Sequence, residues 1–521
     1  MSGVNPWIKG AFILSIAGIF TKILSAVYRV PFQNLVGDHG FYIYQQVYPF
    51  YGIIIAFMMY GFPMAFSKLY VENNENKDRD FTSIFSSLVM ISVVGFLLLN
   101  IGADTLARWM KDDQLSPLFK TLSYLWLLFP FISFRRGLFQ GKGNMFPTAL
   151  SQVGEQLVRV VTILAGAYVL TSTDADLYDV GNVAVFGSIT GGVMALIILY
   201  SYTSWGKLLE WRYFQFNWKI AKNFMVLGFI FSINGLLFVF LQLADSLQLY
   251  PIMVTSGQDP QIAKELKGVY DRGQPLIQLG VVLATSFSLA LVPGLAKLQA
   301  KQEHHEIKKY VKLSIKVSIV IGLAASVGYM MIMEPLNEML FQTASGKKVL
   351  MILTVSVFLG SVIMTSFGIM QGLGYYRPLV FVCMGTFLAK VGFNYILIPF
   401  LGTMGSALAT VLSLVILLGW MANWLWHQGL LKGVSSYFHL KVLMANLIMA
   451  ATVWLSLQLL NDLTWLVSHS RIQSTIQTML SCVVGGFVYL WLIGRFRIFE
   501  EEELVHIPFG KHMKKYSFKA R

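Results

Sequence analysis

The chain has 521 residues, of which 56% are hydrophobic and only 13% are charged. Because an ordinary soluble domain carries about a quarter charged residues, this composition excludes a soluble enzyme or a soluble binding domain. The net charge of +14 is typical of a membrane protein whose cytoplasmic loops collect Lys and Arg, so we expect no nucleic-acid partner.

Apolar blocks of roughly 20 residues recur along the whole chain, which is the length at which a helix spans a bilayer. They predict an all-α polytopic membrane protein with about 14 transmembrane helices. The predicted spans start near residues 8, 43, 83, 119, 148, 180, 221, 274, 311, 350, 378, 403, 440 and 475. Because this number is even, both termini are expected on one side of the membrane.

The distribution of Lys and Arg predicts which side that is. One set of alternate loops, taken with both tails, holds most of the cations, including Arg135, Arg136 and Lys301. The other set includes the segment TSTDADLYDVGN, which has three Asp and no cation. Cytoplasmic loops carry the excess of Lys and Arg, so we expect both termini in the cytoplasm and the chain in the cytoplasmic membrane.

Two segments of the chain resemble each other and indicate an internal duplication. FQGKGNMFPTALSQVGEQLVRV begins at Phe139 and MQGLGYYRPLVFVCMGTFLAKV begins at Met370. At this offset Arg159 matches Lys390. We predict two parallel six-helix lobes, 1–215 and 216–430, followed in 431–521 by two further helices and a basic cytoplasmic tail. Parallel repeats of this kind are a transporter architecture in which substrate binds between the two halves.

Ionisable residues inside the predicted spans are the candidates for function, because a charge in the membrane is costly and usually faces a bundle interior or a wet cavity. The cations are Lys22, Arg29, Arg159 and Lys390, with Arg272 at the mouth of a span, and the acids are Glu155 and Asp245. Lys316 lies near the end of its span and is expected to extend to the membrane surface. Lys22 and Arg29 are seven residues apart, so they share one helix face, and we expect them to line a cavity. The alternative for Arg29 is that it extends to the membrane surface.

The two acids leave alternatives open. Glu155 and Arg159 are spaced for an ion pair on one helix, although the duplicated segment keeps the cation as Lys390 and has Thr386 in place of the acid. Asp245 could pair with a cation or take part in coupling to an ion. The excess of cations suits an anionic substrate, and the planar fork of Arg suits phosphate in particular.

Other chemistries lack their sequence signatures. The chain has no G-x-x-x-x-G-K-[ST] loop, so we expect no ATPase site on it. Its two cysteines, Cys383 and Cys482, both lie in apolar spans and form no metal-binding pattern. We therefore predict no catalytic residues and no metal site.

The amino-terminal segments KGAFILSIAGIFTKILSAVYRVPFQNLVGDHGFYIYQQVYPFYGI and YGFPMAFSKLYVE, with GVYDRGQPLIQLG further on, resemble the polysaccharide flippases of the MOP superfamily. The resemblance is greatest to the Gram-positive branch of SpoVB-like and MurJ-like proteins. It implies a 14-helix fold with a V-shaped cavity between two lobes, in which Arg29 and Arg272 occupy positions of cavity arginines. Lys22 follows Thr21 where relatives have Thr-Arg. The helices in 440–495 would form a groove for a lipid tail.

The resemblance also implies transport of an undecaprenyl-pyrophosphate-linked sugar by alternating access, with lipid II as the leading interpretation. Precursors of other cell-envelope polysaccharides and a cation-coupled multidrug exporter of the same superfamily remain alternatives, as does a non-transporting scaffold or glycan-transferring enzyme. We expect no cofactor, and coupling either to Na⁺ or H⁺ or to the membrane potential. The expected partners are the glycolipid, membrane lipids and cell-wall synthesis enzymes.

Overall fold

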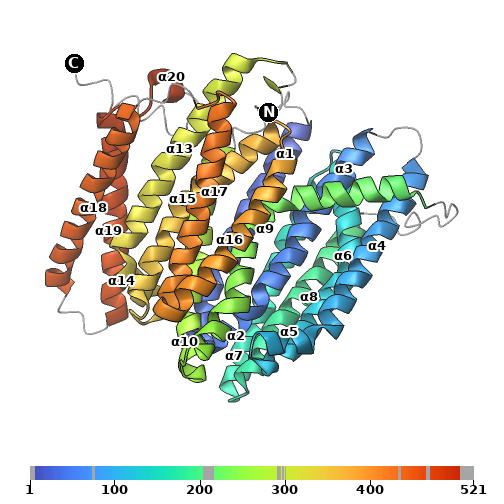
Figure 1. The fold of residues 1–521 in the computed structure, drawn as a ribbon, viewed down its shortest axis with the longest axis horizontal. Helices are drawn as coiled ribbons and strands as arrows, with labels where there is room; N and C mark the ends of the chain where they lie inside the picture. The colour runs from blue at the N-terminus through green and yellow to red at the C-terminus, as the bar shows by residue number, and fades with distance from the viewer. Residues whose placement is uncertain are drawn as a thin grey trace. The chain divides into compact units, whose positions relative to one another are not determined.

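The computed structural model describes residues 6–72, 77–202, 216–289, 295, 298–299, 301–431, 436–464 and 470–504. Every regular element in this part of the chain is a helix (Figure 1), which confirms the all-α prediction. The predicted lobe boundary at 215 and most of the predicted basic tail lie outside the described residues. The division into the lobes 1–215 and 216–430 rests on the sequence repeat and stays a prediction.

The helices fall into two compact units, and the chain passes from the first to the second between Asp271 and Arg272. The first unit also includes Tyr376–Gly402. Its elements are α1 (Pro6–Val27), α2 (Arg29–Ala56), a π-helical turn (Phe57–Gly61), α3 (Phe62–Glu72), α4 (Lys77–Ile101), α5 (Ala103–Trp109), a 3₁₀ turn (Asp113–Leu115), α6 (Ser116–Gly141), α7 (Phe146–Ser172), α8 (Leu177–Ser201), α9 (Trp218–Thr255), α10 (Pro260–Asp271) and α16 (Arg377–Leu401).

The second unit contains the remaining helices. They are α11 (Gly273–Leu289), α13 (His304–Met331), α14 (Met333–Phe341), α15 (Lys347–Gly372), α17 (Thr403–His427), α18 (Ser436–Thr464), α19 (Ser470–Arg495) and α20 (Glu501–Leu504). Helix α13 packs against α11, α15 and α18. Lys316 on α13 forms an ion pair with Glu503 at 2.6 Å, so its ammonium is paired within the protein near the end of the span.

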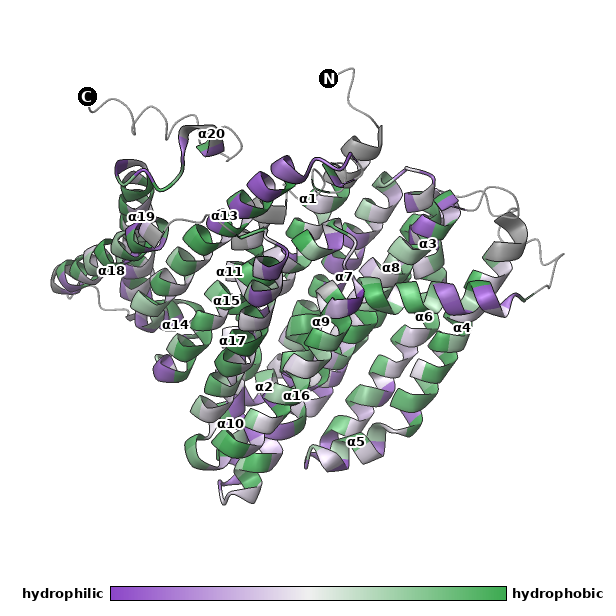
Figure 2. Cartoon of the chain, turned by 45° about the horizontal axis from the view of Figure 1, so that its top comes forward, coloured by the Kyte–Doolittle hydropathy of each residue, from purple (hydrophilic) through white to green (hydrophobic). Residues whose placement is uncertain are grey.

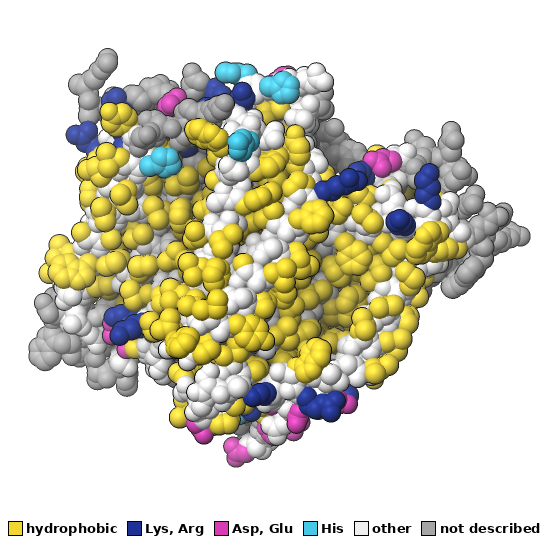
Figure 3. Space-filling model, in the orientation of Figure 1, with side chains coloured by type: hydrophobic (Ala, Val, Ile, Leu, Met, Phe, Trp, Pro, Cys, Tyr) yellow, Lys and Arg dark blue, Asp and Glu magenta, His cyan; other side chains and the backbone are white. Residues whose placement is uncertain are grey.

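Twelve stretches of the described chain are long and apolar enough to cross a membrane. One of them, Ile13–Glu72, covers the two spans predicted to start near residues 8 and 43. The span predicted near 274 corresponds to α11, whose described part has 17 residues. These observations fit the predicted count. Hydrophobic residues dominate along the helices (Figure 2) and over the visible surface, whereas charged side chains gather near helix ends (Figure 3).

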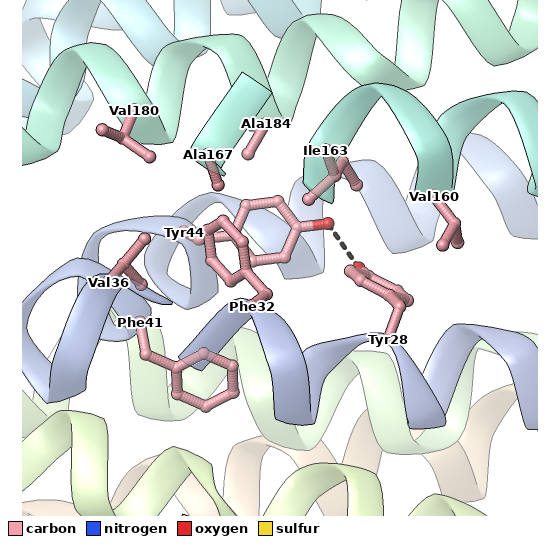
Figure 4. Packing of buried hydrophobic residues seen from close by; sticks show 10 residues of the cluster. All are labelled: Tyr28, Phe32, Val36, Phe41, Tyr44, Val160, Ile163, Ala167, Val180 and Ala184. Carbon is pink, nitrogen blue, oxygen red and sulfur yellow. Dashed lines mark hydrogen bonds between the residues drawn. The ribbon is translucent and has the colours of Figure 1, made fainter. Parts of the chain in front are cut away.

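Close helix packing in the first unit brings α7 beside α8 and α6 beside both α4 and α8. Gly191 on α8 faces α7 so closely that a Cβ there would lie 2.7 Å from the carbonyl oxygen of Glu155. A hydrophobic cluster joins α1, α2, α7 and α8 and includes Phe32 and Ile163 (Figure 4). This cluster fixes the position of the polar residues that lie next to it.

The first two helices are interrupted where charged and polar residues enter the interior. A turn at Tyr28 separates α1 from α2, so that Arg29 is the first residue of α2. Gly37 then has a φ of 68° inside α2, a left-handed conformation that glycine adopts without steric cost. Tyr28 keeps helical backbone angles (φ −61°, ψ −22°), so the kink in this part of the chain lies at Gly37, while the side chain of Arg29 is buried inside the unit.

Candidate functional site

Arg29 is a buried cation whose charged group lies against a tyrosine ring. Its residue exposure is 0%, and none of its three guanidinium nitrogens has a hydrogen-bond partner in the described part of the chain. The guanidinium instead lies over the ring of Tyr48, with its central carbon 4.1 Å from the ring centroid. An aromatic face attracts a cation, but it does not replace the hydrogen bonds that a guanidinium makes in water.

Arg159 on α7 is a second buried cation in the same region. Its Nη2 donates to the hydroxyls of Tyr28 and Tyr44, at 3.1 and 2.6 Å. Those two hydroxyls are themselves 2.6 Å apart and face each other from α2 and the α1–α2 turn (Figure 4). The guanidinium also lies 3.9 Å from the centroid of Tyr51, while its Nε has no hydrogen-bond partner among the residues that the structure describes.

Arg29 and Arg159 together form what we call the arginine pair. Both lie against the ring of Tyr48, since the guanidinium of Arg159 is 5.9 Å from the same centroid. Their positive charges repel each other, and neither makes a salt bridge to a carboxylate among the described residues. The pair is therefore an aromatic-lined site with two positive charges that its own side chains leave uncompensated.

Glu155 does not neutralise Arg159, although the two are one helical turn apart. Its carboxylate pairs with Arg136 of α6 at 2.7 Å, and both side chains are buried. Arg136 also donates from Nε to the hydroxyl of Ser151. The alternative of a Glu155–Arg159 pair is therefore wrong. The prediction that Arg136 lies in a loop is wrong too, because α6 continues to Gly141 and buries it, while the side of the membrane on which it lies stays a prediction.

Asp245 is paired with Lys390, the predicted counterpart of Arg159. The Lys390 ammonium lies 2.7 Å from Oδ1 of Asp245, and both side chains are buried. Tyr270 and Asn394 also donate to the Asp245 carboxylate. Of the two roles left open for Asp245, the structure shows pairing with a cation. Contact of Lys390 with substrate stays a prediction.

Helix α10 carries two further lysines that meet buried acids. Lys267 pairs with Asp271 at 2.6 Å, and Lys264 lies 3.4 Å from Asp112. The hydroxyls of Tyr42 and Tyr178 donate to Asp112 as well. Each buried acid described here, like Glu155 and Asp245, therefore has a cation of its own.

Asp271 attracts Arg29 electrostatically, although the two make no salt bridge among the described residues. It lies outside the stretches that are apolar enough to cross a membrane. Burial raises the pKa of the Asp271 carboxyl to about 6, against the opposing effect of the Lys267 ammonium. Because Lys267 already pairs with it, Asp271 leaves the arginine pair without a partner of its own.

Two other predicted cations, Lys22 and Arg272, are described by their own surroundings. Lys22 is exposed on α1, with its ammonium 6.0 Å from the centroid of Tyr60. Arg272 belongs to the second unit, where its Nη1 donates to Asn337 and Thr343. Their contact with substrate stays a prediction.

Comparison with known proteins places the chain in a family. The profile of the polysaccharide biosynthesis protein family matches residues 7–299, and that of the MatE family matches residues 268–396. The chain is 37% identical to the uncharacterized membrane protein YabM of Bacillus subtilis (strain 168), over 98% of this chain and 96% of YabM. It is 24% identical to the lipid II flippase MurJ of the same organism, over 93% and 94% of the two chains.

Solved structures show the same fold. The lipid II flippase MurJ in an inward closed conformation aligns with a TM-score of 0.68 at 16% identity, covering 93% of this chain and 98% of that one. An inward-facing MATE multidrug transporter of the MOP superfamily aligns with a TM-score of 0.65 at 16% identity, covering 80% and 96%. The chain therefore belongs to the polysaccharide biosynthesis protein family, and the relatives and structural neighbours named here include flippases and transporters.

Proposed function

We propose that this protein is a flippase that moves an undecaprenyl-pyrophosphate-linked sugar across the cytoplasmic membrane by alternating access, with lipid II as the first candidate. The observation that carries the proposal is the arginine pair, two buried guanidiniums that share one tyrosine ring and have no acid partner among the described residues. The similarity to the lipid II flippase MurJ of B. subtilis supports it.

The chemistry of the arginine pair favours a phosphate-bearing ligand. A buried guanidinium without hydrogen-bond partners is costly, and an anion that supplies those partners removes the cost. Both phosphate and carboxylate oxygens match the planar donor fork of arginine. A phosphate presents more oxygens than a carboxylate, so it can accept more of the hydrogen bonds that two guanidiniums offer. A pyrophosphate offers enough oxygens for both guanidiniums at once, while the polyprenyl tail stays in the lipid.

The wider account of transport is part of the same proposal. Both termini lie in the cytoplasm, and the sugar head crosses through the protein together with its pyrophosphate. The change between the inward-facing and outward-facing states requires a ligand or an electric field that favours one of them. The membrane potential supplies such a field, because it acts on the negative charge of the substrate. Membrane lipids and cell-wall synthesis enzymes are the partners we expect.

A cation-coupled multidrug exporter is the second candidate, because the MatE profile matches part of the chain and MATE transporters share its fold. Such an exporter needs acidic groups that can hold a cationic drug or a coupling ion. Glu155, Asp245, Asp271 and Asp112 each face a cation of the protein instead. The electrostatics of the described first unit therefore favour an anionic substrate.

Complementation tests the substrate. We expect this protein to restore growth when the native lipid II flippase of a Gram-positive host is depleted, and to restore lipid II that is accessible at the cell surface. Failure of a well-expressed protein to do so would assign it another lipid-linked glycan, to be sought among precursors of other envelope polysaccharides. Drug resistance on overexpression, without any effect on envelope glycans, would favour the exporter and contradict the proposal.

A further inference from the structure

The environment of Asp245 has the composition of a small-cation site. The carboxylate is buried on α9, and its partners include three donors, the Lys390 ammonium at 2.7 Å, the Tyr270 hydroxyl at 2.6 Å and the Asn394 amide at 3.2 Å. The three donors come from α10 and α16, so this one carboxylate ties three helices of the first unit together.

Two side-chain amides continue the hydrogen-bond network of the same carboxylate. The Asn394 amide nitrogen also donates to Oε1 of Gln248 at 3.1 Å, and Oδ1 of Asn394 is buried without a partner in the described part of the chain. A turn of the Asn394 amide would present this oxygen to the site, since either end of such a group can face a neighbour. One carboxylate and two amide oxygens are the ligand types that hard cations prefer.

We propose that Lys390 is a built-in cation, which occupies at Asp245 the place that an exchangeable Na⁺ would otherwise take. The ammonium of lysine is a compact point charge, and its chain fixes it permanently beside the carboxylate. The protein then completes its cycle without binding a cation at Asp245. This inference goes beyond the proposed function, because it concerns coupling and is independent of the glycolipid carried.

The Arg136–Glu155 pair is the control for the Lys390–Asp245 pair, because side-chain amides are bonded to Asp245 and not to Glu155 in the described part of the chain. It is equally buried, but the described neighbour of its charged groups is the Ser151 hydroxyl rather than two side-chain amides. Removal of Arg136 therefore leaves an acid to which no side-chain amide is hydrogen-bonded in the described part of the chain. Removal of Lys390 leaves an acid linked to two side-chain amides, where a small cation can replace the lost charge.

The test is thermal unfolding of the purified full-length protein in NaCl, KCl or choline chloride at one ionic strength. We expect wild-type protein to unfold at the same temperature in all three salts. Lys390→Gln should be stabilised by Na⁺ in a saturable way, by several degrees at a concentration well above its dissociation constant. Arg136→Gln and the double variant Asp245→Asn/Lys390→Gln should show no selectivity for Na⁺.

Two results would overturn the inference. One is a Lys390→Gln protein that responds equally to the three salts, which would make the pair a structural ion pair only. The other is a saturable Na⁺ stabilisation of wild type that disappears in Asp245→Asn. If Lys390→Gln can be purified in NaCl but not in choline chloride, that difference supports the inference, and failure in both salts counts against it.

Discussion

Replacing Arg29 by Ala is expected to abolish transport while leaving the protein folded and inserted. Each hydrogen bond to a charged group contributes about 1.5–3 kcal/mol, so losing two of them to a pyrophosphate weakens its binding by on the order of a hundredfold or more. Among the described residues none of the Arg29 nitrogens has a hydrogen-bond partner, so the substitution removes a contact with the Tyr48 ring and no salt bridge.

The same observation predicts the effect on stability. A buried polar group without partners costs about 1–3 kcal/mol, so Arg29→Met, which keeps most of the side-chain volume, should unfold at the same or a higher temperature than wild type. Transport is measured with the protein reconstituted in liposomes and a fluorescent lipid-linked pyrophosphate sugar. Lys22→Ala, on the exposed residue of α1, serves as a comparison with a smaller expected loss. Full transport activity in Arg29→Ala would contradict the role of this residue in binding the pyrophosphate.

Arg136 should behave in the opposite way. Replacing Arg136 by Met leaves the Glu155 carboxylate buried and unpaired, a change that costs about 3–5 kcal/mol in proteins. We therefore expect a sharp fall in the yield of folded protein and in the unfolding temperature. Because an ion pair can often be exchanged for apolar residues of similar volume, the double variant Arg136→Met/Glu155→Met should recover most of the stability.

This comparison separates a structural charge from a functional one. Arg136 and Arg29 are both fully buried arginines in the same unit, and they differ in whether an acid faces them. Unfolding temperatures in detergent and the recovery of monodisperse protein measure the effect. An Arg136→Met protein as stable as wild type would contradict the importance that we give to its pairing with Glu155.

The sequence was sufficient for the class of fold and for part of the site. Apolar blocks of bilayer length predicted the helices, and the cost of intramembrane charge identified Arg29 and Arg159. The tyrosines around them were missed, although Tyr44, Tyr48 and Tyr51 are spaced four and three residues apart on α2. That spacing places them on one helix face and could have indicated the aromatic lining.

Pairing between helices could not be read from the sequence. Lys390 and Asp245 are 145 positions apart, and their contact depends on α16 packing against α9. Glu155 had a cation one turn away on its own helix, yet α6 brought Arg136 into better reach. Local spacing predicts which pairs are possible, whereas the tertiary packing of α6, α7, α9 and α16 decides which of them form.

Direct binding tests the central claim, that the arginine pair holds a pyrophosphate. The measurement compares the affinity of the purified protein for undecaprenyl pyrophosphate with its affinity for undecaprenol, which has the same tail and no charge. We predict that wild type strongly prefers the pyrophosphate, and that Arg29→Ala and Arg159→Ala each lose most of this preference without changing the affinity for undecaprenol. Equal preference in wild type and in both variants would contradict the account.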